Sequence, residues 1–229
     1  MRTLLTAAAL LALAAPAAAQ HQHGTPQKAQ PATASGGHAH GGAAAMPDHS
    51  QYPAGWAVRV DRDAARDQVW LMDHGDALHA ATGPAGAVYY NAGWQEQGDY
   101  DYSVRFRQQK ASEHPEGYGL VIGGTGMDGA EQAYSYFLIR QTGEFFVATR
   151  RGEERTKVVD WTASPAIRRT DAQGKAENVL GVRVAGSEVV FTVNGTEVAR
   201  RPKSELATDG ALGLRVNHRL ELLVDQVAR

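Results

Sequence analysis

The chain has 229 residues, a length that suits one all-β domain of ordinary size or two small ones, with one core as the simpler expectation. Its 23 Lys and Arg side chains nearly balance 25 Asp and Glu side chains, so its charge disfavours nucleic acid or an anionic membrane as a partner. The chain contains no cysteine, which excludes disulfide bonds, thiolate metal sites and a thiol nucleophile.

The first 19 residues have the pattern of a cleavable signal peptide. Arg2 gives a positive start, residues 4–15 are apolar, Pro16 breaks the segment, and three alanines follow at 17–19. The apolar run is shorter than the roughly 20 residues that a transmembrane helix needs. No later segment is long and apolar enough to stop transfer. We therefore expect cleavage after the second or third of these alanines, no membrane span, and a protein in the periplasm or outside the cell.

Residues 20–51 contain almost no large apolar side chain and are rich in Ala, Gly, Gln, Pro, Thr and His. Such a segment cannot offset its ordering entropy by burial, so we expect a disordered tether. Two His-x-His pairs in it could each present both imidazoles to a borderline ion such as Zn²⁺ or Cu²⁺: His21 with His23, and His38 with His40. The alternative, which the composition favours, is a solvated linker that happens to contain histidine.

From Trp56 onward, short runs of alternating apolar residues recur between turn residues, and no amphipathic helix interrupts them. This spacing is typical of a β-sandwich or a β-barrel. The twelve predicted strands are 56–60, 69–72, 86–90, 102–108, 118–123, 134–140, 145–150, 156–161, 179–184, 189–193, 211–216 and 220–227.

Short turns predict three hairpins among these strands. The dipeptide Asn194-Gly195, before residues 196–199, suits the positive φ values of a type I′ turn. Thr142-Gly143 and residues 185–187 separate their flanking runs in a similar way. We expect the three hairpins to form a meander.

Successive side chains of a strand face opposite sides of its sheet, which divides residues 134–140 into two sets. Ser135, Phe137 and Ile139 suit the interior between two sheets. The other set combines two phenols, an aliphatic side chain and a guanidinium: Tyr134, Tyr136, Leu138 and Arg140. That mixture suits a surface groove for a polar polymer. By the same alternation, the two arginines of strand 102–108 face outward.

Several motifs follow one another in a fixed order between Gly98 and Asp225. The most specific is Asn178-x-Leu180-x-Val182 followed by Phe191-x-Val193-Asn194-Gly195. Motifs that are weak singly surround it: Gly98-Asp99-Tyr100, Tyr118-Gly119-Leu120-Val121, Tyr136-Phe137 before Gly143, Trp161 with Ala166-Ile167, Gly210-x-x-Gly213-Leu214 and Val224-Asp225. This segment, more than half of the chain, resembles the concanavalin A-like lectin/glucanase superfamily, particularly its laminin G-like and 3-keto-disaccharide-hydrolase-like bacterial branches. The resemblance implies a two-sheet antiparallel β-sandwich, a jelly roll, over residues 52–229.

That superfamily includes hydrolases, lectins and adhesion modules, so the resemblance alone does not fix a function. Retaining glucanases of this fold place Glu-x-Asp-x-Glu on one strand, which sets two carboxylates about 5 Å apart; the run is absent here. The nearest pair, Asp99 and Asp101, suits a polar strand entry. Where the 3-keto-disaccharide-hydrolase branch usually has Asn-Ser-Gly, this chain has residues 118–120, Tyr-Gly-Leu. We therefore assign no catalytic residue.

Other catalytic motifs are also absent: the chain has no Gly-x-Ser-x-Gly, no phosphate-binding Gly-Lys-Ser/Thr loop and no His-Glu-x-x-His. Asp128 and Glu131 lie in or after a glycine-rich loop and could contribute to a Ca²⁺ site, which needs several oxygen ligands. Solvated loop charges are the simpler interpretation of these two carboxylates.

Three functions remain open. The first is an exported non-catalytic module that binds a carbohydrate or a similar polymer through an aromatic and arginine-bearing sheet face. Its predicted ligand residues are Tyr134, Tyr136, Arg140, Arg105, Arg107, Trp161 and Asn178. Alternatively, Trp161 and Tyr136 cap the core and Asn178 holds a turn. The second function is a glycoside-active hydrolase of the 3-keto-disaccharide-hydrolase type, which needs two carboxylates, or a carboxylate and a histidine, in one pocket. The third is an envelope protein that binds metal through its tether.

Overall fold

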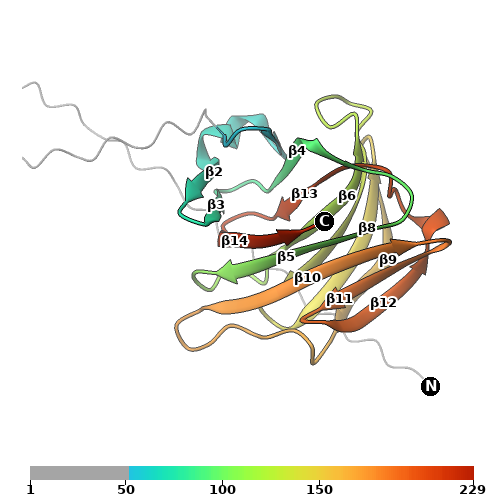
Figure 1. Ribbon diagram of the computed structural model, residues 1–229. Coiled ribbons are helices and arrows are strands. Elements are labelled where there is room, and N and C mark those ends of the chain that lie inside the picture. The colour runs from blue at the N-terminus through green and yellow to red at the C-terminus, as the bar shows by residue number, and fades with distance from the viewer. Residues whose placement is uncertain (1–51) are drawn as a thin grey trace, which may run out of the picture. The chain divides into compact units, whose positions relative to one another are not determined.

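The computed structural model describes residues 52–229, apart from the side chains at 226 and 227, as two antiparallel sheets of seven strands each (Figure 1). Sheet 1 contains, in spatial order, β1 (Trp56–Val60), β4 (Ala87–Glu96), β13 (Gly210–Val216), β6 (Gly117–Thr125), β7 (Ala133–Arg140), β8 (Glu144–Arg151) and β9 (Glu154–Ala163). Sheet 2 contains β12 (Thr196–Pro202), β11 (Glu188–Val193), β10 (Ala176–Ala185), β5 (Tyr100–Gln108), β14 (Glu221–Ala228), β3 (Ala77–Thr82) and β2 (Val69–His74). Two 3₁₀ helices are present, η1 (Asp63–Gln68) and η2 (Lys203–Glu205). Within the described residues, neither helix could cross a membrane.

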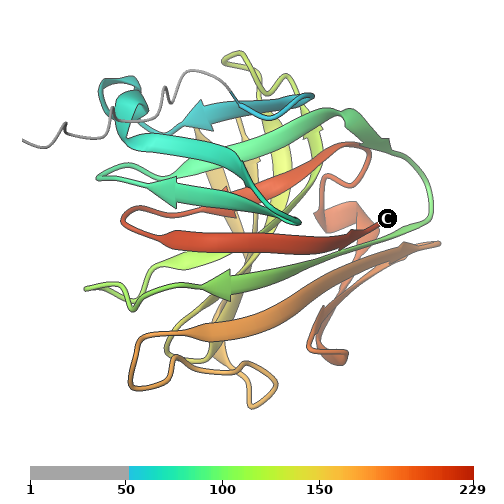
Figure 2. The same cartoon turned by 60° about the vertical axis from the view of Figure 1, so that its left-hand side comes forward.

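Strands from distant parts of the chain lie side by side in both sheets. In sheet 1, β13 lies between β4 and β6; in sheet 2, β14 lies between β3 and β5 (Figure 2). The all-β sandwich prediction is therefore confirmed. The prediction of one meander from three hairpins is wrong, because β7 and β8 belong to sheet 1 whereas β10, β11 and β12 belong to sheet 2. Turn signals are local, and they do not say which sheet a hairpin joins.

Alternation buries one face of each sheet between the two layers. Phe106 of β5 packs against Tyr118 of β6 with ring centroids 5.4 Å apart, and Phe137 of β7 packs against Phe191 of β11 at 5.1 Å. All four side chains are fully buried. Burial of a side chain of this size stabilises a fold by roughly 1.5–3 kcal/mol. The core thus lies between the sheets, and each sheet keeps an outer face.

All twelve predicted strands are present, and two further strands complete the sheets. One is β12, which extends the second arm of the predicted Asn194-Gly195 hairpin. The other is β3, whose sequence Ala-Leu-His-Ala-Ala-Thr carries little strand signal because alanine is depleted in strands. Between β14 and β2, however, its Ala80 and Ala81 are buried. Tertiary burial rather than local propensity makes this segment a strand.

The predicted turn at Asn194-Gly195 is confirmed. Both residues have positive φ, +52° and +81°, and Val193 pairs directly with Thr196 across the two-residue connection. Asparagine and glycine tolerate this left-handed backbone better than other residues, which is why the dipeptide is a reliable hairpin signal.

Candidate ligand-binding groove

A band of aromatic side chains crosses the outer face of sheet 1. Tyr134 and Tyr136 come from β7, Phe146 from β8 and Trp161 from β9. The ring centroids are 5.8 Å apart between the two tyrosines, 6.1 Å apart between Tyr136 and Phe146, and 5.1 Å apart between Phe146 and Trp161. Alternate residues of adjacent antiparallel strands share one face, so the rings lie side by side. The tyrosines and Phe146 are less than a tenth exposed, whereas Trp161 is half-buried, so Trp161 offers the most accessible ring of the four.

Two adjoining cavities on this face form one groove, because they share four lining residues. The first has a volume of about 360 Å³ and is called the aromatic half; it is lined by Asp61, Glu116, Tyr136, Leu138, Phe146, Arg155, Lys157, Asp160, Trp161, Arg215, Asn217 and His218. The second has a volume of about 290 Å³ and is called the arginine half; it is lined by Arg59, Val60, Asp61, Gln132, Tyr134, Tyr136, Arg150, Arg155 and Arg215.

Contacts with neighbouring side chains set the position of Trp161. The guanidinium carbon of Arg140 lies 4.4 Å from the centroid of the indole ring, within the range of a cation–π contact. Arg140 donates to the Glu144 carboxylate through Nε at 2.7 Å and Nη2 at 2.6 Å. These bonds lower the pKa of Glu144 to about 2, so the pair stays ionised at neutral pH. A Cβ at Gly117 would lie 3.0 Å from Cη2 of Trp161, so glycine leaves room for the ring.

Arg215 of β13 lies where the two halves meet and is held as a fixed hydrogen-bond donor. Its Nη1 and Nη2 donate to Oδ1 and Oδ2 of Asp61 at 2.7 and 2.5 Å, and its Nε donates to Oδ1 of Asn217 at 3.1 Å. A Cβ at Gly86 would lie 2.9 Å from Asp61 Oδ2 and 3.0 Å from Arg215 Nη2, so this glycine makes room for the pair. Bidentate geometry of this kind orients a guanidinium before any ligand binds.

Two further pairs of charged or ionisable groups line the aromatic half. His218 Nε2 lies 3.0 Å from Oε1 of Glu116. Lys157 Nζ donates to Oδ2 of Asp160 at 2.5 Å, and the backbone N–H of Trp161 donates to Oδ1 of the same carboxylate at 2.9 Å. Both bonds lower the pKa of Asp160. The aspartate is therefore an ionised hydrogen-bond acceptor beside the indole ring.

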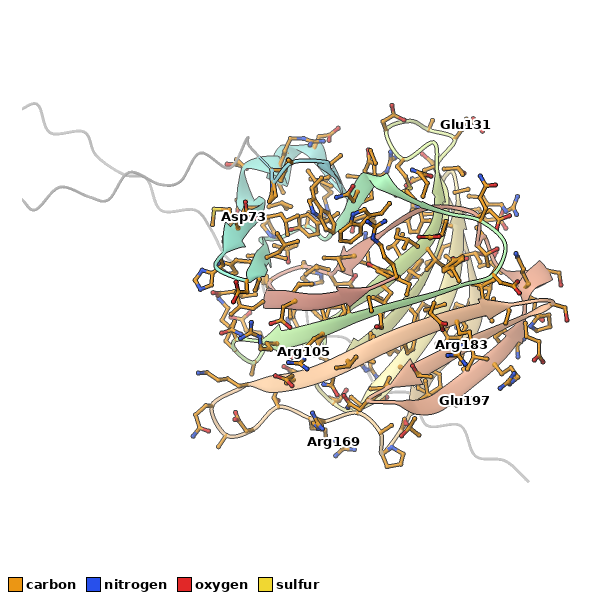
Figure 3. All side chains as sticks on the ribbon, in the orientation of Figure 1. Asp73, Arg105, Glu131, Arg169, Arg183 and Glu197 are labelled. Carbon is orange, nitrogen blue, oxygen red and sulfur yellow. The ribbon has the colours of Figure 1, made fainter. Side chains whose placement is uncertain are left out.

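Four of the seven predicted ligand residues lie on this face: Tyr134, Tyr136, Arg140 and Trp161. The structure does not bring the two predicted arginines of β5 to them. Arg105 and Arg107 lie on the outer face of sheet 2, where Figure 3 labels Arg105 on β5. Arg107 donates to Asp225, and Arg105 Nε lies 3.7 Å from Oε1 of Glu177. Because the core separates the two outer faces, these arginines and the aromatic band cannot share one site.

Asn178, also predicted to bind ligand, lies in the interior and is fully buried. Its Oδ1 accepts the backbone N–H of Arg168 at 2.8 Å and Nδ2 of Asn194 at 2.9 Å, and its own Nδ2 donates to the carbonyl of Arg168 at 2.9 Å. These bonds tie the segment before β10 to the turn after β11. The structure thus supports the alternative role of holding a turn.

Asp61, Arg150, Arg155 and Arg215 line the groove but were not among the predicted residues. Alternation within residues 211–216 marks Arg215 as outward-facing, because Leu214 and Val216 beside it are buried. Arg150 and Arg155 are register partners across β8 and β9, which strand pairing could have shown. No local signal links Asp61 to Arg215, which lies 154 residues further along the chain.

A larger trough, of about 530 Å³, lies on the outer face of sheet 2. Its charged side chains pair with each other: Arg183 Nε donates to Asp101 at 2.7 Å, and Arg200 Nη1 donates to Glu188 at 2.7 Å. Figure 3 shows Arg183 on β10. Its aromatic residue, Tyr102, is buried, and the hydroxyl donates to the backbone at 3.0 Å. The trough therefore combines paired charges with no accessible ring, and the groove of sheet 1 is the better candidate.

Among residues 52–229, no group of three or more His, Asp or Glu side chains comes together as a metal site. The Ca²⁺ hypothesis thus rests on two carboxylates of one loop, and Figure 3 shows Glu131 on that loop, between β6 and β7. The tether histidines lie outside the described residues: His21, His23, His38 and His40.

Titration calorimetry of the full chain with Cu²⁺ and with Zn²⁺ tests whether these four histidines bind metal. A binding heat that disappears when all four are replaced by alanine supports a metal site. Equally weak heats from the unmodified chain and the variant contradict it.

No model of a known protein family matches this chain, and no curated protein matches it in sequence. Solved structures do match its fold. The carbohydrate-binding module CBM66 from Bacillus subtilis aligns over 76% of this chain and 93% of its own, with a TM-score of 0.57 and 11% identity. A Bacillus subtilis protein of unknown function with a galectin-like fold aligns over 76% of this chain and 90% of its own, with a TM-score of 0.52 and 12% identity.

The metal-free carbohydrate recognition domain of Emp46p is also similar, over 80% of this chain and 91% of its own, with a TM-score of 0.51 and 8% identity. At such low identities the similarity concerns the fold alone. The described residues therefore adopt a two-sheet β-sandwich fold similar to that of these three domains.

Proposed function

We propose that this chain is an exported, non-catalytic module that binds a carbohydrate polymer in the groove on the outer face of sheet 1. The observation that carries the proposal is Trp161, a half-buried ring held by Arg140 at the edge of a cavity lined by fixed polar groups. An indole ring packs on the apolar C–H face of a sugar, and planar charged groups bind sugar hydroxyls. The Arg215–Asp61 pair supplies such groups on the same surface.

The comparisons support this proposal through the fold, since CBM66 is named as a carbohydrate-binding module and the matched domain of Emp46p as a carbohydrate recognition domain. A closer relation to the laminin G-like or 3-keto-disaccharide-hydrolase-like branch is part of the same proposal. It rests on the order of motifs between Gly98 and Asp225.

Export belongs to the proposal as well. Residues 1–19 would be the signal peptide, 20–51 the tether, and 52–229 the binding domain in the periplasm or outside the cell. The intact mass of the chain recovered from the periplasm or medium of a bacterial host tests this. A mass lacking the first 18 or 19 residues supports export, whereas recovery of the uncleaved chain from the cytoplasm alone contradicts it.

A glycan array probed with the purified full chain tests carbohydrate binding. The proposal predicts binding to at least one class of glycan, and weaker binding by the Arg140→Ala variant, because the indole ring loses the guanidinium that contacts it. Failure to bind any glycan would favour a structural role for the sandwich.

The hydrolase alternative has one observation in its favour, the pair of His218 and Glu116 in the aromatic half. Against it, the other two carboxylates lining that half, Asp61 and Asp160, are each hydrogen-bonded to a cationic side chain, Arg215 and Lys157, so neither is free to act on a substrate. We therefore expect no turnover. Chromatography of oligosaccharides incubated with the chain and with the Glu116→Gln variant should show no products in either sample. Products formed by the unmodified chain and lost in the variant would establish the hydrolase instead.

A further inference from the structure

Positive charge is concentrated in one half of the groove. The arginine half is lined by four arginines and one aspartate, a formal excess of three positive charges, although the whole chain carries a net charge of −2. The aromatic half, in contrast, is lined by three cationic and three acidic side chains besides His218. The charge of the groove therefore changes from balanced to positive along its length.

Three of these four arginines have no carboxylate partner among the described residues. Arg215 pairs with Asp61, but Arg59, Arg150 and Arg155 take part in none of the ion pairs of residues 52–229. Arg59 is occupied, because its Nη1 donates to backbone carbonyls of the loop after β6 at 3.2 and 2.8 Å. Arg150 and Arg155 are therefore the guanidiniums whose charge no ion pair neutralises, and Arg155 is also oriented by a hydrogen bond with the Tyr136 hydroxyl.

Arg150 and Arg155 are register partners on the neighbouring strands β8 and β9. Within residues 52–229, Arg150 donates through Nε to the carbonyl of Gly152 at 3.0 Å, which orients the side chain, and its two terminal nitrogens make no hydrogen bond there. The Arg155 guanidinium lies 5.9 Å from the ring centroid of Phe146, in the floor of the aromatic half. Arginines on neighbouring strands can donate several hydrogen bonds to the oxygens of a planar carboxylate or a tetrahedral sulfate.

Neutral hydrogen-bonding groups share the same cavity. Gln132 is 3% exposed; its Nε2 donates to the carbonyl of Gly152 at 3.1 Å, whereas its buried Oε1 has no hydrogen-bond partner in the described structure. An amide oxygen accepts a hydroxyl hydrogen but repels an anion. The arginine half thus combines cationic side chains with neutral hydrogen-bonding residues, a mixture that suits a ligand with both acidic groups and hydroxyls.

We propose that the ligand is an acidic polysaccharide and that Arg150 and Arg155 bind its carboxylate or sulfate groups in the arginine half. This inference rests on the proposed carbohydrate-binding function. A sugar unit lies against Trp161 in the aromatic half, and the acidic group of a neighbouring unit reaches Arg150 and Arg155. Residues shared by the two halves, such as Tyr136 and Arg215, contact both units.

The test compares four probes by titration calorimetry on the full chain at one fixed salt concentration. Alginate oligosaccharides supply uronates, heparin oligosaccharides supply sulfates, cello-oligosaccharides are neutral, and an oligothymidylate is a polyanion without free sugar hydroxyls. We expect an alginate or heparin probe to bind at least about tenfold more tightly than the neutral and nucleic-acid probes. Preference for alginate or for heparin then identifies the acidic group.

The double variant Arg150→Gln/Arg155→Gln should weaken binding of the acidic glycan by about tenfold to hundredfold, because two charge-assisted hydrogen-bonding groups are lost. Arg183→Gln/Arg200→Gln on sheet 2 removes the same charge and should change the affinity less than about threefold. Arg155→Lys keeps the positive charge but lacks the planar guanidinium that can donate two parallel hydrogen bonds. Its affinity should lie between those of the unmodified chain and the double variant. Thermal unfolding of each variant verifies that the fold is intact.

The possible failures are distinguishable. If cello-oligosaccharides bind as tightly as acidic glycans and the double variant binds both normally, the acidic-ligand inference is wrong and the proposed function stands. If no glycan binds, both are wrong. If oligothymidylate binds as tightly as the acidic glycans, or both double variants weaken binding equally, the attraction is non-specific and the inference is overturned.

Discussion

Replacing Trp161 with alanine should weaken glycan binding by about tenfold or more while leaving the sandwich folded. The ring is the most accessible of the four in the aromatic band, and a hot-spot aromatic side chain of this kind contributes at least ~1.4 kcal/mol to binding. Because Trp161 is partly exposed, the substitution should lower the free energy of unfolding by only about 1 kcal/mol. Titration calorimetry with the best glycan from the array gives the affinity, and scanning calorimetry gives the stability.

Two variants make the Trp161 result interpretable. Val190→Ala shortens an apolar side chain in the trough of sheet 2 and should leave glycan affinity unchanged if the groove of sheet 1 is the site. Gly117→Ala keeps the indole but places a methyl group 3.0 Å from its Cη2, so it should weaken binding by shifting the ring. If Trp161→Ala binds glycan as tightly as the unmodified chain does and Val190→Ala binds it more weakly, the binding site lies on sheet 2 instead.

Asn178→Ala should lower the free energy of unfolding by about 3 kcal/mol, because it removes the three hydrogen bonds that this buried amide makes with the Arg168 backbone and the Asn194 side chain. For a domain of this size, that loss corresponds to a melting temperature lower by roughly 6–12 °C. Glycan affinity measured well below the transition should not change, since Asn178 lies in the interior. Scanning calorimetry and glycan titration separate these two effects.

Gln173→Ala is the matched control for Asn178→Ala. It removes an amide of similar size from an exposed turn and should change the melting temperature by no more than about 1–2 °C. An Asn178→Ala protein that melts normally and has lost glycan affinity would return this asparagine to the binding site.

The inward and outward faces of individual strands were predictable, because alternation is a property of each strand on its own. Residues 134–140 illustrate this, since Phe137 and Ile139 are in the core whereas Tyr134 and Tyr136 are on the outer face. The sheet to which a strand belongs was not predictable from the same pattern. Arg105 and Tyr136 both face outward, but from opposite sheets, so they could not be sorted into one site.

The composition of the groove depends on contacts that no local pattern records. Asp61 reaches Arg215 only because β1 and β13 both pair with β4, which brings residues 154 positions apart together. Asn178 has the sequence context of a sheet residue, yet the chain around Arg168 folds over it and uses its amide. Tertiary contacts therefore decided why Asp61 was missed and why Asn178 was misplaced.

A crystal structure of the full chain with the glycan that binds best on the array tests most directly whether the groove of sheet 1 is the binding site. We expect sugar rings in this groove, with one ring against Trp161 and an acidic group within hydrogen-bonding distance of Arg150 or Arg155. Sugar bound instead in the trough of sheet 2, between β5 and β12, would contradict it.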